Sequence, residues 1–472
     1  MEHTFSEEIM KACDIRGIYP QELDERDAYH IGRAFGTIMA REGRTTCALG
    51  YDGRESSPQL ADKLSRGLCD SGIKVFLLGV LPSPAVYIAV QVLAVDAGVV
   101  VTASHNPAEY NGVKFLLSDR LFHGDSIQEL GKISKEGSYS IPMSLGEVVD
   151  MDFTDTYIDY LIGFLDITQE KKLKIVWDPG NGAVAAVIHQ LTQQIPGEHV
   201  LICSELDSRF PNHHPDPSLP ENLSLLRKTV LETRADFGVA FDGDGDRIGV
   251  VSASGRILQG DQLLVLFARE HLSQFPGDTI MSEVKASTFF YEEIVRAGGK
   301  PLMWKVGHTN QKEKMVKEGI SLAGETSGHI FFAENFGFDD GLFAAIKLIN
   351  RYVKSGMSLE EEVAQFPHLY DSGEIRLELP REQRAYLVAD IIENLHANNR
   401  DVVTLDGVRV SCADGFWMLR GSNTQPHVTI RCEGRSKEGF DICMEDLQRH
   451  IAHANIDMDA VTVYREKPSS GG

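Results

Sequence analysis

Two short segments contain the residues whose types and spacing best suit catalysis. Residues 100–107 read Val-Val-Thr-Ala-Ser-His-Asn-Pro, so Ser104 stands on a loop directly after an apolar strand, beside His105. Far downstream, residues 242–247 read Asp-Gly-Asp-Gly-Asp-Arg, with three carboxylates on alternate residues. Together these segments indicate a serine that carries phosphate next to a divalent metal ion.

The aspartate segment favours a hard cation. In an extended segment alternate side chains lie on one side, about 6.6 Å apart, so Asp242, Asp244 and Asp246 would point together. Neighbouring carboxylates would then repel by roughly 2.5 kcal/mol at an effective dielectric constant near 20. An all-oxygen set of this kind suits Mg²⁺. The alternatives are an acidic turn with solvated carboxylates and a phosphohydrolase that uses Asp242 as nucleophile, which would leave the Ser104 loop unexplained.

Size and composition restrict the class of protein. The chain has 472 residues, enough for several domains. Its longest apolar runs, such as residues 263–268, are too short to span a bilayer, and no secretion signal is seen at the start. The formal charge of -23 argues against nucleic-acid and membrane partners, which reward a basic surface. Seven scattered cysteines favour reduced thiols and a cytoplasmic location.

The periodicity of apolar residues predicts an α/β protein. Apolar strands alternate with helical patterns in three cycles, which is typical of parallel sheets covered by helices. The expected strands are residues 46–50, 74–78, 97–102, 173–177, 237–241, 279–282, 302–305 and 321–323, and the expected helices include 58–71, 84–95, 183–193 and 259–274.

The end of the chain has a different pattern. Two-periodic runs at 373–379, 402–410, 416–419 and 427–432, with helices at 380–396 and 445–454, predict an α+β domain with an antiparallel sheet. We therefore expect domains at 1–150, 151–255, 256–367 and 368–472, and a disordered tail at 467–472.

Longer motifs of polar and glycine residues occur along essentially the whole chain. They are Lys11-Ala-Cys-Asp-Ile-Arg-Gly17, Thr102–Lys114, Phe210–Pro217, Asp242–Arg247, Glu283-Val-Lys285, Trp304–His308, Gly324-Glu-Thr-Ser-Gly-His329 and Arg420-Gly-Ser-Asn-Thr-Gln-Pro426. In this order they resemble the α-D-phosphohexomutase superfamily, and specifically its bifunctional phosphomannomutase/phosphoglucomutase branch.

The resemblance implies a fold and a reaction. It implies four domains around a central cleft, the first three with a related α/β core and mixed sheets, the last α+β. It also implies a phosphorylated Ser104 whose phosphate binds Mg²⁺ with Asp242, Asp244 and Asp246. The phosphoryl group passes to a hexose monophosphate, and a hexose 1,6-bisphosphate intermediate returns the other phosphate to serine. Mannose and glucose phosphates are the implied small-molecule substrates, with glucose 1,6-bisphosphate or mannose 1,6-bisphosphate as activator, and we expect a monomer or weak dimer.

The resemblance also implies roles around the reacting phosphate. Arg247 would neutralise charge on the transferring group, and His329 would lie near the reacting centre. Arg16, His105 and Lys114 match the place of the base that takes the sugar proton. Lysine and histidine are chemically easier bases than arginine, and the choice between them stays open.

Other motifs match substrate-binding loops. Glu325 and Ser327 would contact the 3- and 4-hydroxyls, which glucose and mannose share, although either residue alone is an ordinary loop polar group. Lys285 and His308 would line the cleft. The remaining matches form a donor loop for the non-reacting phosphate, namely Arg420, Ser422, Asn423 and Thr424. Arg431 is either a further donor to this phosphate or an exposed strand charge, and we expect the second.

Three residues depart from the family pattern. Cys13 stands where this branch usually has tyrosine, Thr309 where serine is common and Thr326 where methionine is frequent. We expect these changes to alter catalytic efficiency or the mannose/glucose ratio. Phosphoglucosamine mutase is the nearest alternative, but it typically has Arg-Pro-Ser-Gly-Thr-Glu-Pro in the phosphate loop. An aspartate-nucleophile sugar phosphatase is the alternative from another reaction class.

Overall fold

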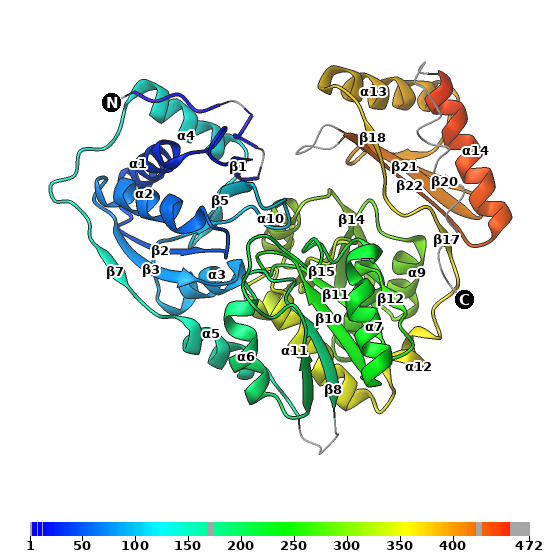
Figure 1. Cartoon of the computed structure of the whole chain (residues 1–472). Coiled ribbons are helices and arrows are strands. Elements are labelled where there is room, and N and C mark those ends of the chain that lie inside the picture. The colour runs from blue at the N-terminus through cyan, green and yellow to red at the C-terminus, as the bar shows by residue number, and fades with distance from the viewer. Residues whose placement is uncertain (1, 7, 12, 168–172, 422–426, 454–472) are drawn as a thin grey trace.

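The computed structural model describes residues 2–6, 8–11, 13–167, 173–421 and 427–453. They form four sheets in chain order, each with its own helices (Figure 1). The first three sheets mix parallel and antiparallel pairs and the fourth is antiparallel, so the expected fold class is confirmed. Among the described helices, none is both long and apolar enough to cross a membrane. The tail expected at 467–472 lies outside the described residues.

The first sheet has the order β1-β5-β4-β2-β3-β7, and β6 pairs with β5. Every residue of β4 is buried, because β4 lies inside the sheet between β5 and β2 and is covered on both faces. The strands are β1 (Ile15–Ile18), β2 (Thr46–Tyr51), β3 (Lys74–Val80), β4 (Ala97–Val101), β5 (Tyr110–Leu117), β6 (Arg120–Leu121) and β7 (Val148–Asp150). The helices are α1 (Glu25–Arg41), α2 (Ser57–Cys69), α3 (Ser83–Val92) and α4 (Asp125–Glu136).

The second sheet has the order β12-β11-β10-β8-β9, with β8 at the centre of the parallel part. Its strands are β8 (Lys174–Asp178), β9 (Glu198–Leu201), β10 (Phe237–Phe241), β11 (Ile248–Ser252) and β12 (Ile257–Leu258). Its helices are α5 (Thr154–Ile162), α6 (Ala185–Gln194), η1 (Pro220–Leu223) and α7 (Ser224–Thr233).

The third sheet has the order β14-β13-β15-β16. Its strands are β13 (Thr279–Glu283), β14 (Lys300–Trp304), β15 (Leu322–Gly324) and β16 (Ile330–Phe332). Its helices are α8 (Gly260–Gln274), α9 (Thr288–Arg296), α10 (His308–Glu318), η2 (Ala333–Asn335), α11 (Gly341–Ser355) and α12 (Leu359–Val363).

The fourth sheet has the order β17-β22-β21-β20-β19, and β18 also pairs with β22. Its final helix begins eight residues before the predicted start at 445, since Ser436 Oγ accepts a hydrogen bond from Gly439 N (3.0 Å) and caps the first turn. The elements are β17 (Tyr370–Asp371), β18 (Ile375–Glu378), α13 (Arg381–Ala397), β19 (Val402–Val403), β20 (Val408–Cys412), β21 (Gly415–Gly421), β22 (His427–Gly434) and α14 (Lys437–His453).

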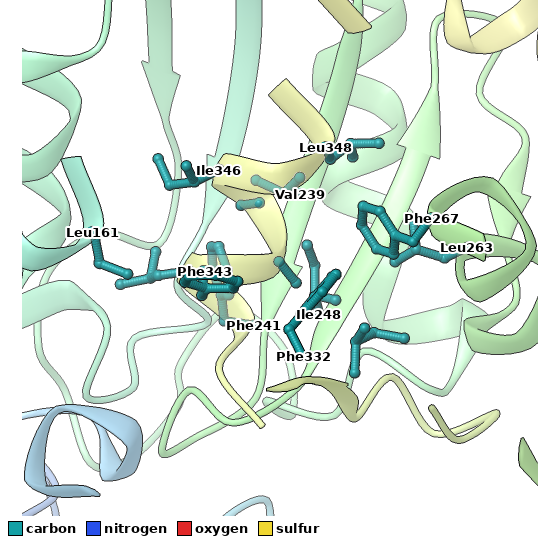
Figure 2. Packing of buried hydrophobic residues seen from close by; sticks show 14 of the residues in the cluster. Leu161, Val239, Phe241, Ile248, Leu263, Phe267, Phe332, Phe343, Ile346 and Leu348 are labelled. Carbon is teal, nitrogen blue, oxygen red and sulfur yellow. The ribbon is translucent and has the colours of Figure 1, made fainter. Parts of the chain in front are cut away.

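Helix α11 joins the second and third sheets into one apolar core. Figure 2 shows its side chains Phe343, Ile346 and Leu348 in one cluster with residues of both sheets. Val239 and Phe241 come from β10, and Phe332 and Phe267 come from β16 and α8. Burying a side chain of this kind contributes about 1.5–3 kcal/mol, so the shared core holds the loop after β10 in place.

Candidate active site

Ser104 lies on the loop that follows β4, in a left-handed backbone conformation (φ 51°). The buried guanidinium of Arg54 holds this loop by donating to four carbonyl oxygens, those of Ser104, Asn106, Pro107 and Tyr110. The clamp fixes the serine backbone while the hydroxyl stays directed at the aspartates. The motif analysis missed Arg54, although Asp-Gly-Arg directly after β2 is a polar signal at the carboxyl end of a parallel strand.

A second missed residue, Asp52, supports the same loop. Its carboxylate accepts hydrogen bonds from Thr102 Oγ1 (2.8 Å) and Ser57 Oγ (2.6 Å). Thr102 Oγ1 in turn accepts from Ser104 N (2.9 Å). Because β2 and β4 are parallel neighbours, their ends meet at one edge of the sheet, which brings these side chains together.

The three aspartates follow β10 in a tight turn rather than the extended segment that we expected. The turn depends on Gly245, whose φ is 80°. Ligand atoms of Asp242, Asp244 and Asp246 lie within 4.8 Å of one another, and all three side chains are buried. The three carboxylates therefore lie closer together than they would in an extended chain, because the turn folds them inward.

The serine and the aspartates meet directly. Ser104 Oγ donates to Asp242 Oδ2 at 2.7 Å. The loops also touch through the backbone, since a Cβ on Gly243 would lie 2.3 Å from the carbonyl oxygen of Ser104. Glycine at this position therefore permits the approach.

Lys114 is the cation closest to the centre of the cluster. From β5, its Nζ donates to Asp244 Oδ2 and Asp246 Oδ2, both at 2.7 Å. Burial alone would lower the pKa of Lys114, but the two carboxylates outweigh it and hold the pKa well above its usual value. The ammonium is therefore a fixed positive charge in this arrangement.

The cluster fits Mg²⁺ on its own donor set. Asp244 Oδ1 and Asp246 Oδ1 are buried and find no hydrogen-bond partner within the described part of the chain. Burial and the neighbouring carboxylates raise the pKa of Asp242 well above its usual range. Buried oxygen ligands without donors and excess negative charge both indicate a hard cation site. With Asp242, these atoms would hold the ion.

Arg247 and His329 line one side of the cluster. Arg247 Nε donates to His329 Nε2 (3.0 Å), and Arg247 also lies 3.6 Å from Asp216 and 3.8 Å from Asp242. The other ring nitrogen of His329 is 2.8 Å from Asp339 Oδ2. Asp216 and Asp339 were not singled out from the sequence. Their carboxylates orient a cation and an imidazole beside the place where a phosphate would react.

His105 and Arg16 approach the serine from the first domain. The His105 ring has Nδ1 3.2 Å from Ser104 Oγ. Burial, followed by Arg247, lowers the pKa of His105 well below its usual value, so the ring is neutral and can accept a proton. Arg16 donates to Asn106 Oδ1 (2.7 Å) and to Asp14 Oδ2 (2.5 Å), which directs its guanidinium along the serine loop.

The loop after β15 brings polar groups of the third domain together. Glu325 Oε1 accepts from Gly307 N (2.6 Å), and Ser327 Oγ donates to Glu325 Oε2 (3.3 Å). His308, at the start of α10, stacks on His329 with ring centroids 5.5 Å apart. The structure thus connects Glu325, Ser327 and His308 to the aspartate cluster through His329.

Cations from the last two domains lie near this loop. Lys285 Nζ is 3.1 Å from Glu374 Oε2 and 3.6 Å from Glu283 Oε1. Arg420 Nε is 3.3 Å from Asp406 Oδ2, which also accepts from Val306 N. Three predicted residues of the same phosphate loop lie outside the described residues, namely Ser422, Asn423 and Thr424.

The expectation for Arg431 was wrong. This side chain is 7% exposed and donates to Asp371 Oδ2 (2.5 Å) and to the carbonyl oxygen of Lys285 (2.6 Å). It is buried because β22 faces the third domain instead of solvent. Arg431 therefore ties the fourth domain to the segment that carries Lys285.

Cys13 lies where the first and third domains meet. Thr309 Oγ1 donates to Cys13 Sγ at 2.9 Å, so two of the three departures from the family pattern are in contact. Both residues line a pocket together with Lys114, His308 and Lys312. The third departure, Thr326, donates to Glu283 Oε1 through its hydroxyl (2.5 Å).

Comparisons with known proteins agree over almost the whole chain. Models of the phosphoglucomutase/phosphomannomutase family match residues 7–139 (alpha/beta/alpha domain I), 155–255 (domain II), 259–370 (domain III) and 374–449 (C-terminal domain). A phosphomannomutase/phosphoglucomutase of Pseudomonas putida is 40% identical over 429 residues, which are 91% of this chain and 92% of that protein.

Two further proteins show the same similarity. A phosphoglucomutase of Neisseria gonorrhoeae is 37% identical and covers 93% of this chain and 95% of its own length. A solved structure of a phosphoglucomutase/phosphomannomutase family protein from Burkholderia thailandensis superposes with a TM-score of 0.89 at 36% identity, covering 96% of this chain and 98% of that one.

Proposed function

The chain belongs to the phosphoglucomutase/phosphomannomutase family, and we propose that it interconverts the 1-phosphates and 6-phosphates of mannose and glucose. The names of its relatives suggest both sugars. One observation carries the assignment of the reacting residue: the hydroxyl of Ser104 donates to Asp242 inside a buried cluster of three aspartates. A serine in that place is suited to carry a phosphoryl group beside Mg²⁺.

Two transfers make up the reaction. In the first, the bond between phosphorus and Ser104 Oγ breaks while the free hydroxyl oxygen of a hexose monophosphate bonds to phosphorus and releases its proton to a base. The product is a hexose 1,6-bisphosphate, which turns over in the site. As it leaves phosphorus in the first transfer, Ser104 Oγ takes up a proton from His105, whose Nδ1 is 3.2 Å away. In the second, Ser104 Oγ returns this proton to His105 and bonds to the other phosphoryl group, while the bond between that phosphorus and its sugar oxygen breaks. The freed sugar oxygen takes back the proton held by the base. The sugar leaves with its phosphate moved between carbons 1 and 6.

Fixed charges stabilise these transfers. Mg²⁺ held by Asp242, Asp244, Asp246 and the serine phosphate would neutralise charge on the transferring group. Lys114 and Arg247 add positive charge in a buried setting, where it is most effective. Glucose 1,6-bisphosphate would act as activator by phosphorylating Ser104.

Residues around the cluster are suited to hold the sugar. Glu325 and Ser327 offer an acceptor and a donor to hydroxyls that glucose and mannose share. Lys285, His308 and Arg420 are suited to the non-reacting phosphate, with Ser422, Asn423 and Thr424 as further donors. Loss of one of these charged contacts is expected to raise KM about tenfold, which corresponds to about 1.4 kcal/mol.

A coupled mutase assay tests the proposal. Mannose 1-phosphate and glucose 1-phosphate are offered separately with Mg²⁺ and a trace of glucose 1,6-bisphosphate, to the wild type and to Ser104→Ala. Turnover of both sugars, lost in the variant by at least a thousandfold, is expected, and mass spectrometry should find phosphate on Ser104 of the wild type. Release of inorganic phosphate without isomerisation would instead indicate a phosphatase, and turnover of glucosamine phosphates alone would indicate the glucosamine branch.

A further inference from the structure

A second group of metal-binding side chains lies at the carboxyl end of β8 and β9, outside the proposed active site. Asp178 is the last residue of β8, Cys203 follows β9 by two residues, and His213 lies on the loop before η1. A carboxylate oxygen, the thiol sulphur and a ring nitrogen of these three residues lie within 4.8 Å of one another. The proposed mutase reaction uses none of them.

The histidine of this group is held as a metal ligand would be. His213 Nδ1 lies 3.0 Å from the carbonyl oxygen of His214, which fixes the ring, and Nε2 lies 3.0 Å from Asp178 Oδ2. Ligating histidines commonly donate their outer N–H to a backbone carbonyl in this way. Asp178 is fully buried, and its other oxygen, Oδ1, accepts from Gly180 N (3.0 Å). Oδ2 and Nε2 thus face one another within 4.8 Å of the half-buried thiol of Cys203.

A nucleophilic triad explains this group less well. In such a triad the histidine uses one ring nitrogen for the carboxylate and keeps the other for the nucleophile. Here Nδ1 of His213 faces the carbonyl oxygen of His214 and Nε2 faces Asp178, each at 3.0 Å, so neither ring nitrogen is kept for the thiol of Cys203. A hydrogen-bonded network of Asp178, His213 and Cys203 without an ion is the other alternative, and a metal titration distinguishes it from an ion site.

We propose that Asp178, Cys203 and His213 bind a thiophilic divalent cation of the Zn²⁺ class, with water as fourth ligand. One nitrogen, one oxygen and one sulphur ligand with an open position form a donor set that suits Zn²⁺ and not Mg²⁺. Tetrahedral bonds to such an ion would place the ligand atoms about 3.3–3.7 Å apart. The three ligand atoms already lie within 4.8 Å of one another, and His213 Nε2 and Asp178 Oδ2, now 3.0 Å apart, would separate slightly to admit the ion. Binding releases the thiol proton and the Nε2 proton to solvent, and no oxidation occurs.

The position of this cation site connects it to the active site. His213 lies three residues before Asp216, whose carboxylate faces Arg247 at 3.6 Å. On the other side of the group, the segment after Asp178 reaches the aspartate turn, where Ala183 N donates to the carbonyl oxygen of Gly243 (2.9 Å). A bound ion would tie β8, β9 and the loop after Cys203 together and so stiffen the support of the aspartate turn.

Cobalt titration tests this proposal independently of mutase activity. Metal-free protein is given excess Mg²⁺, to occupy the hard-cation site, and is then titrated with Co²⁺ while the near-ultraviolet charge-transfer band of a thiolate–Co²⁺ bond is recorded. We expect one equivalent of Co²⁺ to produce the band in the wild type. Cys203→Ser should abolish it, whereas Cys412→Ser, the matched control at another half-buried thiol, should leave it unchanged.

A second variant checks the histidine. His213→Gln keeps the thiol and should weaken Co²⁺ binding at least tenfold, and Zn²⁺ should raise the melting temperature of the wild type but not of either variant. No thiolate band in the wild type, or a band that survives Cys203→Ser, would overturn the proposal. Neither result depends on whether the chain turns over hexose phosphates.

Discussion

Replacing Lys114 with methionine tests how the buried aspartates are neutralised. The Lys114 ammonium lies 2.7 Å from two carboxylates, and all three side chains are at most 6% exposed. At an effective dielectric constant near 20, each contact corresponds to about 6 kcal/mol of gross attraction. Desolvation of the charges offsets most of this, and removing one partner of a buried pair costs about 3–5 kcal/mol. We therefore expect Lys114→Met to lower the free energy of unfolding of the second domain by about that amount without Mg²⁺.

A surface lysine provides the matched control. Lys74 forms a pair of nearly the same length with Glu147 (2.8 Å), but the two side chains are 41% and 66% exposed. Pairs of that kind contribute about 0–1 kcal/mol. Lys74→Met should therefore have little effect, so that burial and the second carboxylate partner of Lys114 account for the difference between the two variants.

The second domain contains a convenient probe of its own unfolding. Trp177 is fully buried in β8 of the sheet that carries the aspartates. The chain has three tryptophans, so urea titration in a background with Trp304→Phe and Trp417→Phe follows Trp177 fluorescence alone. Added Mg²⁺ should stabilise Lys114→Met more than the wild type, because the ion then replaces the missing ammonium. A cost below about 1 kcal/mol without Mg²⁺, or equal effects of Lys114→Met and Lys74→Met, would refute this reasoning.

Three further predictions concern the loops around the site. Gly243→Ala places a Cβ 2.3 Å from the carbonyl oxygen of Ser104, so the serine loop and the aspartate turn must move apart. This displacement should lower kcat about a hundredfold. The control Gly131→Ala, whose Cβ would meet only Met10 at 3.5 Å, should leave kcat unchanged. Burial raises the pKa of Asp340 to about 7. The pKa of Asp340 in the folded protein thus exceeds its value in the unfolded chain, so its stabilising contribution is complete below about pH 4. This contribution is lost as the pH rises to 7, by up to about 1.4 kcal/mol per pH unit. Urea titrations from pH 5 to 8 should show this slope in the wild type and not in Asp340→Asn. Cys13→Tyr should change the ratio of kcat/KM between mannose 1-phosphate and glucose 1-phosphate, and unchanged values for both would contradict a role of Cys13 in sugar packing.

The strands and the reacting loops were accessible from local sequence. Continuous apolar runs such as 97–101 and 237–241 indicate strands buried on both faces. Ser104 and Asp242 follow these runs directly, so their place at the strand ends could be predicted. Helix α14 was predicted too short, because the cap at Ser436 depends on one side-chain hydrogen bond that hydrophobic periodicity does not contain.

Motif reasoning missed several site residues. Arg54 acts through backbone carbonyl oxygens, and its one local signal is the polar Asp-Gly-Arg directly after β2. Asp339 acts through His329, and no motif singled it out. Arg431 was taken for a surface charge because an alternating strand pattern shows which face a residue occupies, but not which domain covers that face.

The amino-acid order by itself determined which residues could bind a metal ion, carry phosphate or hold a sugar, and on which strand ends they stand. Only the tertiary structure decided their partners. Ser104 meets Asp242 across 138 residues of chain, and Lys114 meets Asp246 across 132. Such contacts depend on how whole sheets pack through α11 and the interdomain surfaces, and packing is a property of distant apolar faces rather than of the local residues that react.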